Sequence, residues 1–177
     1  MPPSPSPPPS WTTYRIGRGE QGVLTFEPYK SALLPLWRFK TPEIATKSSQ
    51  ELWSKFLQYE VDDDFVGMDM ARKFLQMGMT RAKRYANHKG GKKYGVGGKA
   101  KGQMIEVPKE DWEGRKEKEE ASAIFREVWE RAKAWEGYLE MKEEFLRKQK
   151  GWDQEQSKGH RAENWKRKRK REDVVIT

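Results

Sequence analysis

The sequence predicts a mainly α protein: one compact helical domain, with a short N-terminal β-hairpin, flanked by disordered tails. Apolar residues recur every three or four positions in several long segments, which indicates helices with one buried face. Hydrophobic residues make up 34% of the 177 residues and charged residues 36%, so we expect part of the chain to lie outside the core. Eight Trp, seven Phe and six Tyr still supply large apolar groups for a modest core.

The composition changes along the chain and divides it into three parts. Residues 1–10 hold six of the ten prolines, which favours an extended, disordered tail. Residues 11–150 are expected to form a single mostly helical domain. Residues 151–177 are polar and strongly basic, and we expect a disordered basic tail there.

The first elements of the domain are expected from turn and capping residues. Residues 11–26 place β-prone side chains on either side of a glycine-bearing turn, which predicts the short hairpin. Thr41 followed by Pro42 and Glu43 is typical of a helix start, because Thr caps free amides and Pro is tolerated in the first turn. Asp62 to Asp64 are expected to end this helix and cap the next. The predicted buried face of the helix that starts at Thr41 carries Ile44, Ser48, Leu52, Phe56 and Tyr59.

Residues 65–88 predict an amphipathic helix with a basic face. At about 100° per residue, the apolar and basic side chains fall in opposite arcs. Gly78 lies on the apolar side, where it would allow close contact with a neighbouring helix. The apolar arc holds Met68, Ala71, Phe74, Leu75, Gly78, Met79, Ala82, Tyr85 and Ala86. The basic arc holds Arg72, Lys73, Arg81, Lys83, Arg84 and His88.

Two further segments follow this helix. Residues 88–102 combine six glycines and five lysines without an acidic residue, which predicts a mobile basic loop. Residues 109–148 are charged and helical in pattern, with a bend expected at Gly137. Their apolar stripe consists of Ala121, Ile124, Phe125, Val128, Ala132, Trp135 and Leu139.

The distribution of charge points to a polyanionic partner. Residues 72–101 carry ten basic residues and no acidic one, whereas solvated helix faces normally mix the two signs. Arginine and lysine on a helix and an adjoining glycine-rich loop are suited to phosphate oxygens. We therefore expect a nucleic-acid-binding protein that contacts the phosphate backbone, with the choice between DNA and RNA left open. The candidate nucleic-acid or anion-binding residues are Arg72, Lys73, Arg81, Lys83, Arg84, His88, Lys89, Lys92, Lys93 and Tyr94.

A second basic run lies near the C-terminus. A run of this kind in a polar tail resembles a nuclear localisation signal that an import receptor reads, which predicts a nuclear protein shared with the cytoplasm. The alternative interpretation is a generic basic tail that adds nonspecific affinity for nucleic acid. The run consists of Lys166, Arg167, Lys168, Arg169, Lys170 and Arg171.

Two other functions compete with nucleic-acid binding. Gly17, Gly19 and Gly22 match a phosphate-binding spacing, but the strand-to-helix context of that motif is missing, which favours a plain hairpin turn. The alternative function is a small enzyme or ligand-binding protein for a phosphorylated or anionic metabolite. It would use Arg81, Arg84 and the loop 17–22, together with His88. Docking to an acidic protein partner would explain the same charge.

Several classes of protein are excluded or disfavoured. The chain has no cysteine, which excludes disulfides, Cys-ligated metals and cysteine nucleophiles. The acidic residues 62–64 and Asp69 lack the spacing of a calcium loop, so we interpret residues 62–64 as helix caps and expect neither metal nor cofactor. Motifs for a hydrolase nucleophile are missing, so no catalytic residue is assigned and the sequence leans away from an enzyme. Neither a membrane span nor a secretion signal is expected.

Four segments resemble a small conserved-domain family of unknown function that occurs in fungi, bacteria and large tailed phages. The segments are RIGRGEQGVL (15–24), EPYK (27–30), LWRFKTPEIA (36–45) and DDFVGMDMARKFLQMGMTRAKRYANHKGGKKY (63–94). The resemblance covers roughly residues 13–145 and implies one compact domain with a shared role for the basic helix region. It implies no catalytic residues. The proline-rich start and the basic tail lie outside it, which fits addressing to a eukaryotic nucleus.

Overall fold

The protein is mainly α, as the sequence predicted. The computed structural model describes residues 10–91, 94–95, 105–106 and 113–175. Two-residue strands pair antiparallel, Tyr94 opposite Glu106 and Gly95 opposite Ile105. The elements are α1 (Ser10–Thr13), α2 (Tyr29–Leu33), η1 (Leu34–Leu36), α3 (Pro42–Val61), α4 (Phe65–Asn87), η2 (Lys89–Gly91), β1 (Tyr94–Gly95), β2 (Ile105–Glu106), α5 (Arg115–Ala134) and α6 (Glu136–Val175).

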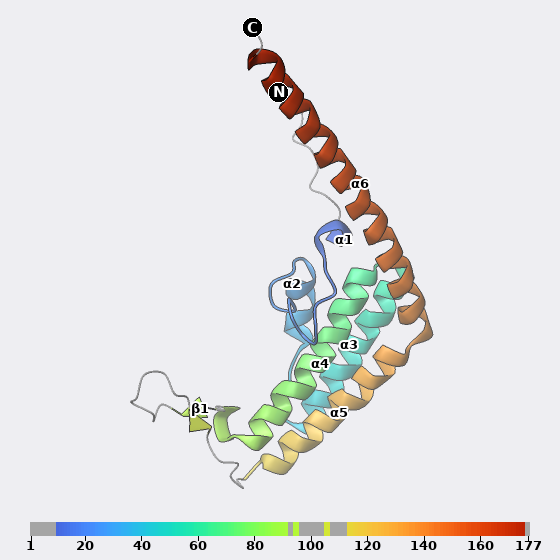
Figure 1. Ribbon diagram of the computed structural model, residues 1–177. Helices are drawn as coiled ribbons and strands as arrows, with labels where there is room; N and C mark the ends of the chain where they lie inside the picture. The colour runs from blue at the N-terminus through green and yellow to red at the C-terminus, as the bar shows by residue number, and fades with distance from the viewer. Residues whose placement is uncertain (1–9, 92–93, 96–104, 107–112, 176–177) are drawn as a thin grey trace, which may run out of the picture.

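Helices α3, α4 and α5 lie side by side and form the body of the molecule (Figure 1). Helix α5 runs antiparallel to α4, with Phe125 against Gly78 and the Ser122 hydroxyl donating to the Met79 carbonyl at 2.9 Å. A Cβ at Gly78 would collide with the Phe125 ring. The close helix contact predicted at this glycine is therefore confirmed.

The predicted caps begin α3 and α4. The Thr41 hydroxyl accepts from the Ile44 amide at 3.3 Å, and the Asp64 carboxylate accepts from the Gly67 amide at 2.9 Å. On α3, Ser48, Leu52 and Phe56 are buried as predicted, whereas Ile44 is exposed and Tyr59 half-buried. The short turn at 62–64 turns the chain back, so that α4 packs along α3.

The predicted N-terminal hairpin is wrong. Residues 18–25 form successive turns, with amide-to-carbonyl bonds from Gln21 to Arg18, from Val23 to Glu20 and from Thr25 to Gly22. Gly19 and Gly22 have φ of 61° and 82°, which glycine adopts without steric cost. The β-prone side chains are used for packing instead: Tyr14 and Val23 are buried in the core. This segment covers α4 and needs no strand partner to do so.

The chain bends at Trp135, two residues before the predicted position. Trp135 is extended, with φ −65° and ψ 124°, and separates α5 from α6. Its indole Nε1 donates to both carboxylate oxygens of Glu60 at 2.9 Å, which ties the junction to the end of α3. Gly137 belongs to α6, and a Cβ there would collide with the Glu60 carboxylate. The glycine provides space for that carboxylate and is not itself the bend.

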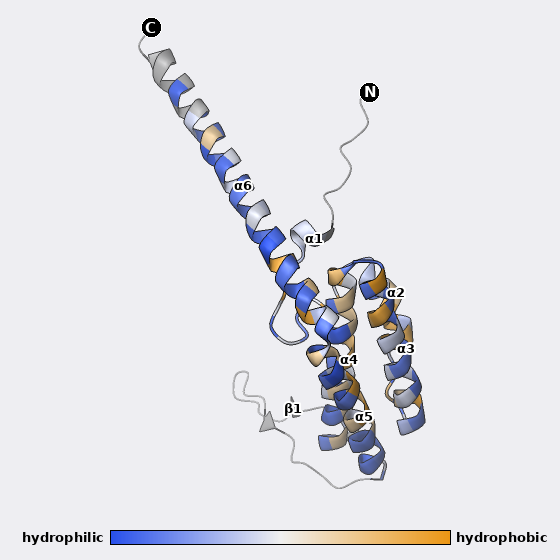
Figure 2. Ribbon diagram, turned by 90° about the vertical axis from the view of Figure 1, so that its right-hand side faces the viewer, coloured by the Kyte–Doolittle hydropathy of each residue, from blue (hydrophilic) through white to orange (hydrophobic). Residues whose placement is uncertain are grey.

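The C-terminal segment differs from the expectation of disorder from residue 151. Helix α6 continues through Val175, and the exposed residues over 153–165 are mostly good helix formers. Figures 1 and 2 show α6 leaving the bundle with a largely hydrophilic surface. Helicity here follows from local propensity, because the polar pattern offers no face to bury. The predicted tail over residues 1–10 lies outside the described residues except for Ser10.

Candidate functional site

The basic residues predicted as one exposed face of α4 fall into two groups. Lys83 and Arg84 are exposed and Arg81 is half-buried, all in the last two turns of the helix. The Lys83 ammonium lies 3.6 Å from the Glu119 carboxylate of α5. These three cations lie in the last two turns of α4, at the end of the bundle where β1 lies (Figure 1).

Arg72 and Lys73 are buried, which corrects the prediction that they contact phosphates. The guanidinium of Arg72 bonds the Asp69 carboxylate through Nε and Nη2, both at 2.8 Å. The Lys73 ammonium donates to the Gln21 carbonyl at 3.0 Å and lies 3.6 Å from Asp69. The N-terminal segment covers this half of α4, so the face that periodicity assigned to solvent is enclosed by residues distant in sequence.

Asp69 organises a buried network of charges and hydroxyls. Its carboxylate accepts hydrogen bonds from the Tyr14 hydroxyl and, at 2.8 Å, from the Tyr138 hydroxyl of α6. Burial alone would raise the pKa of Asp69, but the Arg72 and Lys73 cations and the two tyrosines bring that pKa below its ordinary value. Burial and the neighbouring carboxylate raise the pKa of both tyrosines, which therefore stay protonated donors. Sequence reasoning missed this network, although Asp69 precedes the cations by three and four residues.

His88 is also buried, so its predicted contact with a polyanion is corrected. Its amide donates to the Arg84 carbonyl at 3.0 Å and its carbonyl accepts from Gly91 at 2.8 Å, so it ends α4. Within the described residues its Nδ1 has no hydrogen-bond partner. Lys89 contributes backbone to η2 and Tyr94 contributes backbone to β1. Lys92, Lys93 and most of the predicted basic loop lie outside the described residues.

The glycine loop at 17–22 does not have the form of an anion cradle. A cradle directs backbone amides at the anion. Here the Gln21 carbonyl accepts from Lys73, and the Glu20 carboxylate accepts from the Thr80 hydroxyl of α4. The loop thus presents acceptors to α4, and the metabolite-binding alternative loses one of the features that it would use.

The C-terminal basic run lies on the projecting part of α6. Arg167 and Arg169 are exposed, and the Arg169 guanidinium lies 4.5 Å from the centre of the Trp165 ring. The Trp165 side chain is itself 58% exposed. A cation stacked on an exposed indole leaves one ring face and the guanidinium edge open to a partner.

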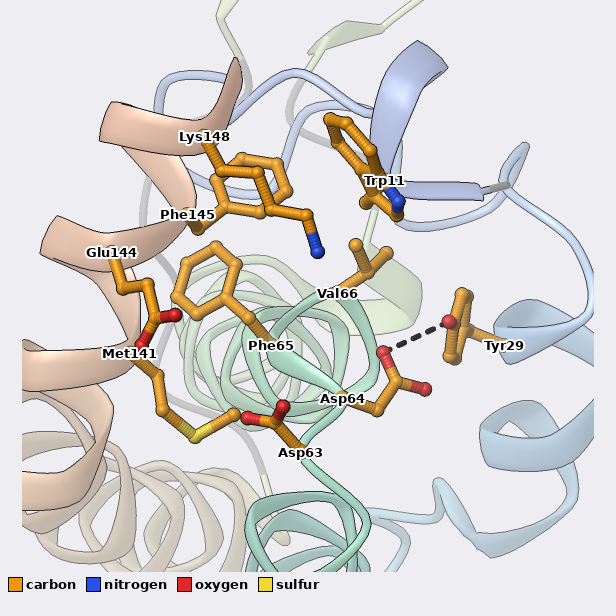
Figure 3. A pocket seen from close by; sticks show the side chains of 10 residues that line it. All are labelled: Trp11, Tyr29, Asp63, Asp64, Phe65, Val66, Met141, Glu144, Phe145 and Lys148. Atoms are coloured by element: carbon orange, nitrogen blue, oxygen red, sulfur yellow. Dashed lines mark hydrogen bonds between the residues drawn. The ribbon is translucent and has the colours of Figure 1, made fainter. Parts of the chain in front are cut away.

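A cavity of about 250 Å³ lies where α1, α2, the α3–α4 turn and α6 meet (Figure 3). Aromatic and apolar side chains line it, with carboxylates and one lysine among them. Its residues come from four separate parts of the chain, so no local motif could have revealed it. They are Trp11, Tyr29, Asp63, Asp64, Phe65, Val66, Met141, Glu144, Phe145 and Lys148.

Two classes of site find no support in the described part of the chain. Its histidine and acidic side chains form no group of three that could hold a metal ion. Of its helices, none combines the length and the apolar character that crossing a membrane requires.

The fold and these sites define a helical domain built around one central helix, with cations at the end of that helix and along a projecting C-terminal helix. The chain belongs to a family described as a domain of unknown function (DUF4385), which matches residues 9–149. The match confirms the predicted resemblance to a family of unknown function; the distribution of that family in fungi, bacteria and phages stays a prediction. No curated protein and no solved structure matches the chain.

Proposed function

We propose that the protein binds nucleic acid through its phosphate backbone, with the end of α4 as the principal contact. The observation that carries the proposal is the one-signed charge of residues 81–101, which hold eight basic residues and no acidic one. Arg72 and Lys73 balance Asp69 in the core. Arg81, Lys83 and Arg84 remain for the partner, at the helix end from which the basic loop continues.

The projecting part of α6 provides a second basic surface for the same partner. The run 166–171 follows the exposed Trp165, and an exposed ring beside cations is suited to stacking on a base while the cations bind phosphates. We further propose that an import receptor recognises this run and that the protein is nuclear, with the cytoplasm as a second location. The run lies beyond the family match, which ends at residue 149.

The experiment is a salt series of nucleic-acid binding, measured by fluorescence anisotropy on the full chain. To remove the contribution of the tail, residues 166–171 are all changed to Gln in the background protein. Arg81→Ala with Arg84→Ala is then expected to lower the slope of log affinity against log salt by about 0.7–0.9 for each phosphate that the variant no longer neutralises. Duplex DNA, single-stranded DNA and RNA are compared to identify the preferred acid.

The matched control removes two exposed cations elsewhere, with Lys47→Ala and Lys55→Ala on α3. This variant has the same net charge as the double arginine variant, so it is expected to keep the slope of the background protein. Equal slopes in both variants would show that binding follows net charge alone, and the assignment to α4 would be wrong. The six-Gln background also tests the import proposal, because it is expected to lose nuclear accumulation.

A further inference from the structure

The cavity beside α6 is separate from both basic surfaces and has the chemistry of a binding site. Its floor is aromatic: the Phe65 and Phe145 rings are 4.7 Å apart, and both side chains are buried. Trp11 and Tyr29 stand opposite α6 and continue the aromatic lining (Figure 3). Concave, aromatic sites with a few polar groups are typical of small-molecule recognition.

The three carboxylates of the cavity are not equivalent. Asp64 caps α4 and accepts from the Tyr29 hydroxyl at 3.0 Å and the Gly67 amide at 2.9 Å, so its charge is compensated. Asp63 and Glu144 are exposed, and their side chains have no hydrogen-bond or ion-pair partner in the described part of the chain. Two uncompensated carboxylates next to aromatic rings favour a cation.

A side chain of the protein already shows which chemistry the cavity accepts. The Lys148 ammonium points into it and lies 4.7 Å from the centre of the Trp11 ring (Figure 3). Among the residues described, this ammonium forms no ion pair with Asp63, Asp64 or Glu144. The cavity therefore has an ammonium beside an indole, while the carboxylates of Asp63 and Glu144 stay unpaired. An external ammonium that reached these carboxylates would gain charge-assisted hydrogen bonds.

We propose that this cavity binds a small organic ammonium ion that carries an apolar group. The apolar group packs on Phe65 and Phe145, and the ammonium donates to the carboxylates of Asp63 and Glu144. The Lys148 ammonium competes with the ligand, because it occupies the cavity and carries the same positive charge. The ligand thus replaces a tethered ammonium with one that reaches both carboxylates.

The test is calorimetric titration of the full chain with four probes that share a phenyl ring. The probes are 2-phenylethylammonium, the neutral 2-phenylethanol, the anionic 3-phenylpropionate and the zwitterion phenylalanine. The ammonium is expected to bind most tightly. Asp63→Asn and Glu144→Gln are each expected to weaken it about tenfold, the loss of one charge-assisted hydrogen bond. Asn suits position 63 because the backbone there has φ of 52°, which Asn tolerates.

Lys148→Gln gives the sharper test, because the proposal expects it to tighten binding of the ammonium. Glu143→Gln is the matched control: it removes an exposed carboxylate from the neighbouring position, outside the cavity, and should leave affinity unchanged. Circular dichroism checks that each variant is folded. The proposal is overturned if 2-phenylethanol binds as tightly as the ammonium, if phenylalanine binds best and Lys148→Gln weakens it, or if no probe binds.

Discussion

At the scale of single residues, the main feature is a carboxylate that neutralises two cations inside the core. Asp69 and Lys73 are fully buried and Arg72 nearly so. A buried charge is tolerated when its partners satisfy it, and removal of one partner leaves the others uncompensated. The polar residues of the first half of α4 thus stabilise the fold and are not free to bind a ligand.

Replacing Asp69 with Asn is expected to destabilise the protein strongly. Arg72 and Lys73 would stay buried without a counter-charge, which typically costs about 3–5 kcal/mol. The matched control is Asp153→Asn, because Asp153 also pairs with an arginine, Arg15 at 2.9 Å, but at the surface. Such exposed pairs contribute about 0–1 kcal/mol. Urea unfolding followed by circular dichroism measures both, and equal losses would contradict a structural role for the network.

The same carboxylate makes stability depend on pH in a defined direction. Burial alone would raise the pKa of Asp69, but the Arg72 and Lys73 cations and the two tyrosine hydroxyls together outweigh burial, so this pKa is lower in the folded protein than its ordinary value. Its stabilising contribution is therefore complete above the unfolded pKa of about 3.9 and is lost as the pH falls through the folded value. Asp69→Asn is expected to flatten the loss of unfolding free energy below about pH 4. If the unfolding free energy of this variant falls with pH as steeply as that of the wild type, the acid sensitivity belongs to other carboxyl groups.

At the scale of elements, local patterns predicted the helices but not what covers them. Thr41 and Asp64 cap helices as expected, since capping depends on only a few neighbouring residues. The hairpin failed because Tyr14 takes its partners from α4 and α6, which no local pattern contains. The helical pattern placed Arg72 and Lys73 on a solvent-exposed face for the same reason. It separates an apolar face from a basic one, but it does not show that the N-terminal segment also covers the basic face.

The junction of α5 and α6 gives a prediction about glycine. Gly137→Ala is expected to cost about 1–3 kcal/mol, since a Cβ would collide with the Glu60 carboxylate that holds Trp135. Gly151→Ala is the control: it lies in the same helix with nothing within 4 Å of an added Cβ. It is expected to stabilise α6 by up to about 1 kcal/mol. Thermal unfolding distinguishes these opposite shifts, and shifts of the same sign would contradict the packing described here.

At the scale of the whole molecule, α6 gives the protein an extended shape. Its 40 residues span about 60 Å at 1.5 Å per residue. Trp152 still contacts Trp11, with ring centres 5.6 Å apart, whereas the described side chains from residue 153 to Trp165 are exposed. The second basic surface is thus held away from the bundle.

Small-angle X-ray scattering is expected to detect this projection. A compact domain of 177 residues would have a radius of gyration of about 16 Å. The intact protein is expected to exceed that value clearly, and a chain ending at residue 158 is expected to approach it while its unfolding free energy changes by less than about 0.5 kcal/mol. A compact radius for the full chain would mean that α6 folds back onto the bundle.

The connections of the N-terminal segment also bear on how the chain folds during synthesis. The Tyr14 hydroxyl bonds Asp69, and the carbonyls of Trp11 and Tyr14 accept from the Gln149 amide at 3.2 and 2.6 Å. A ribosome makes Tyr138 and Gln149 long after it makes Trp11. A nascent chain that stops before α6 therefore lacks the Gln149 partner of the Trp11 and Tyr14 carbonyls and the Tyr138 partner of Asp69. The native arrangement of the start of the chain is therefore completed only when synthesis passes residue 149, where the family match also ends.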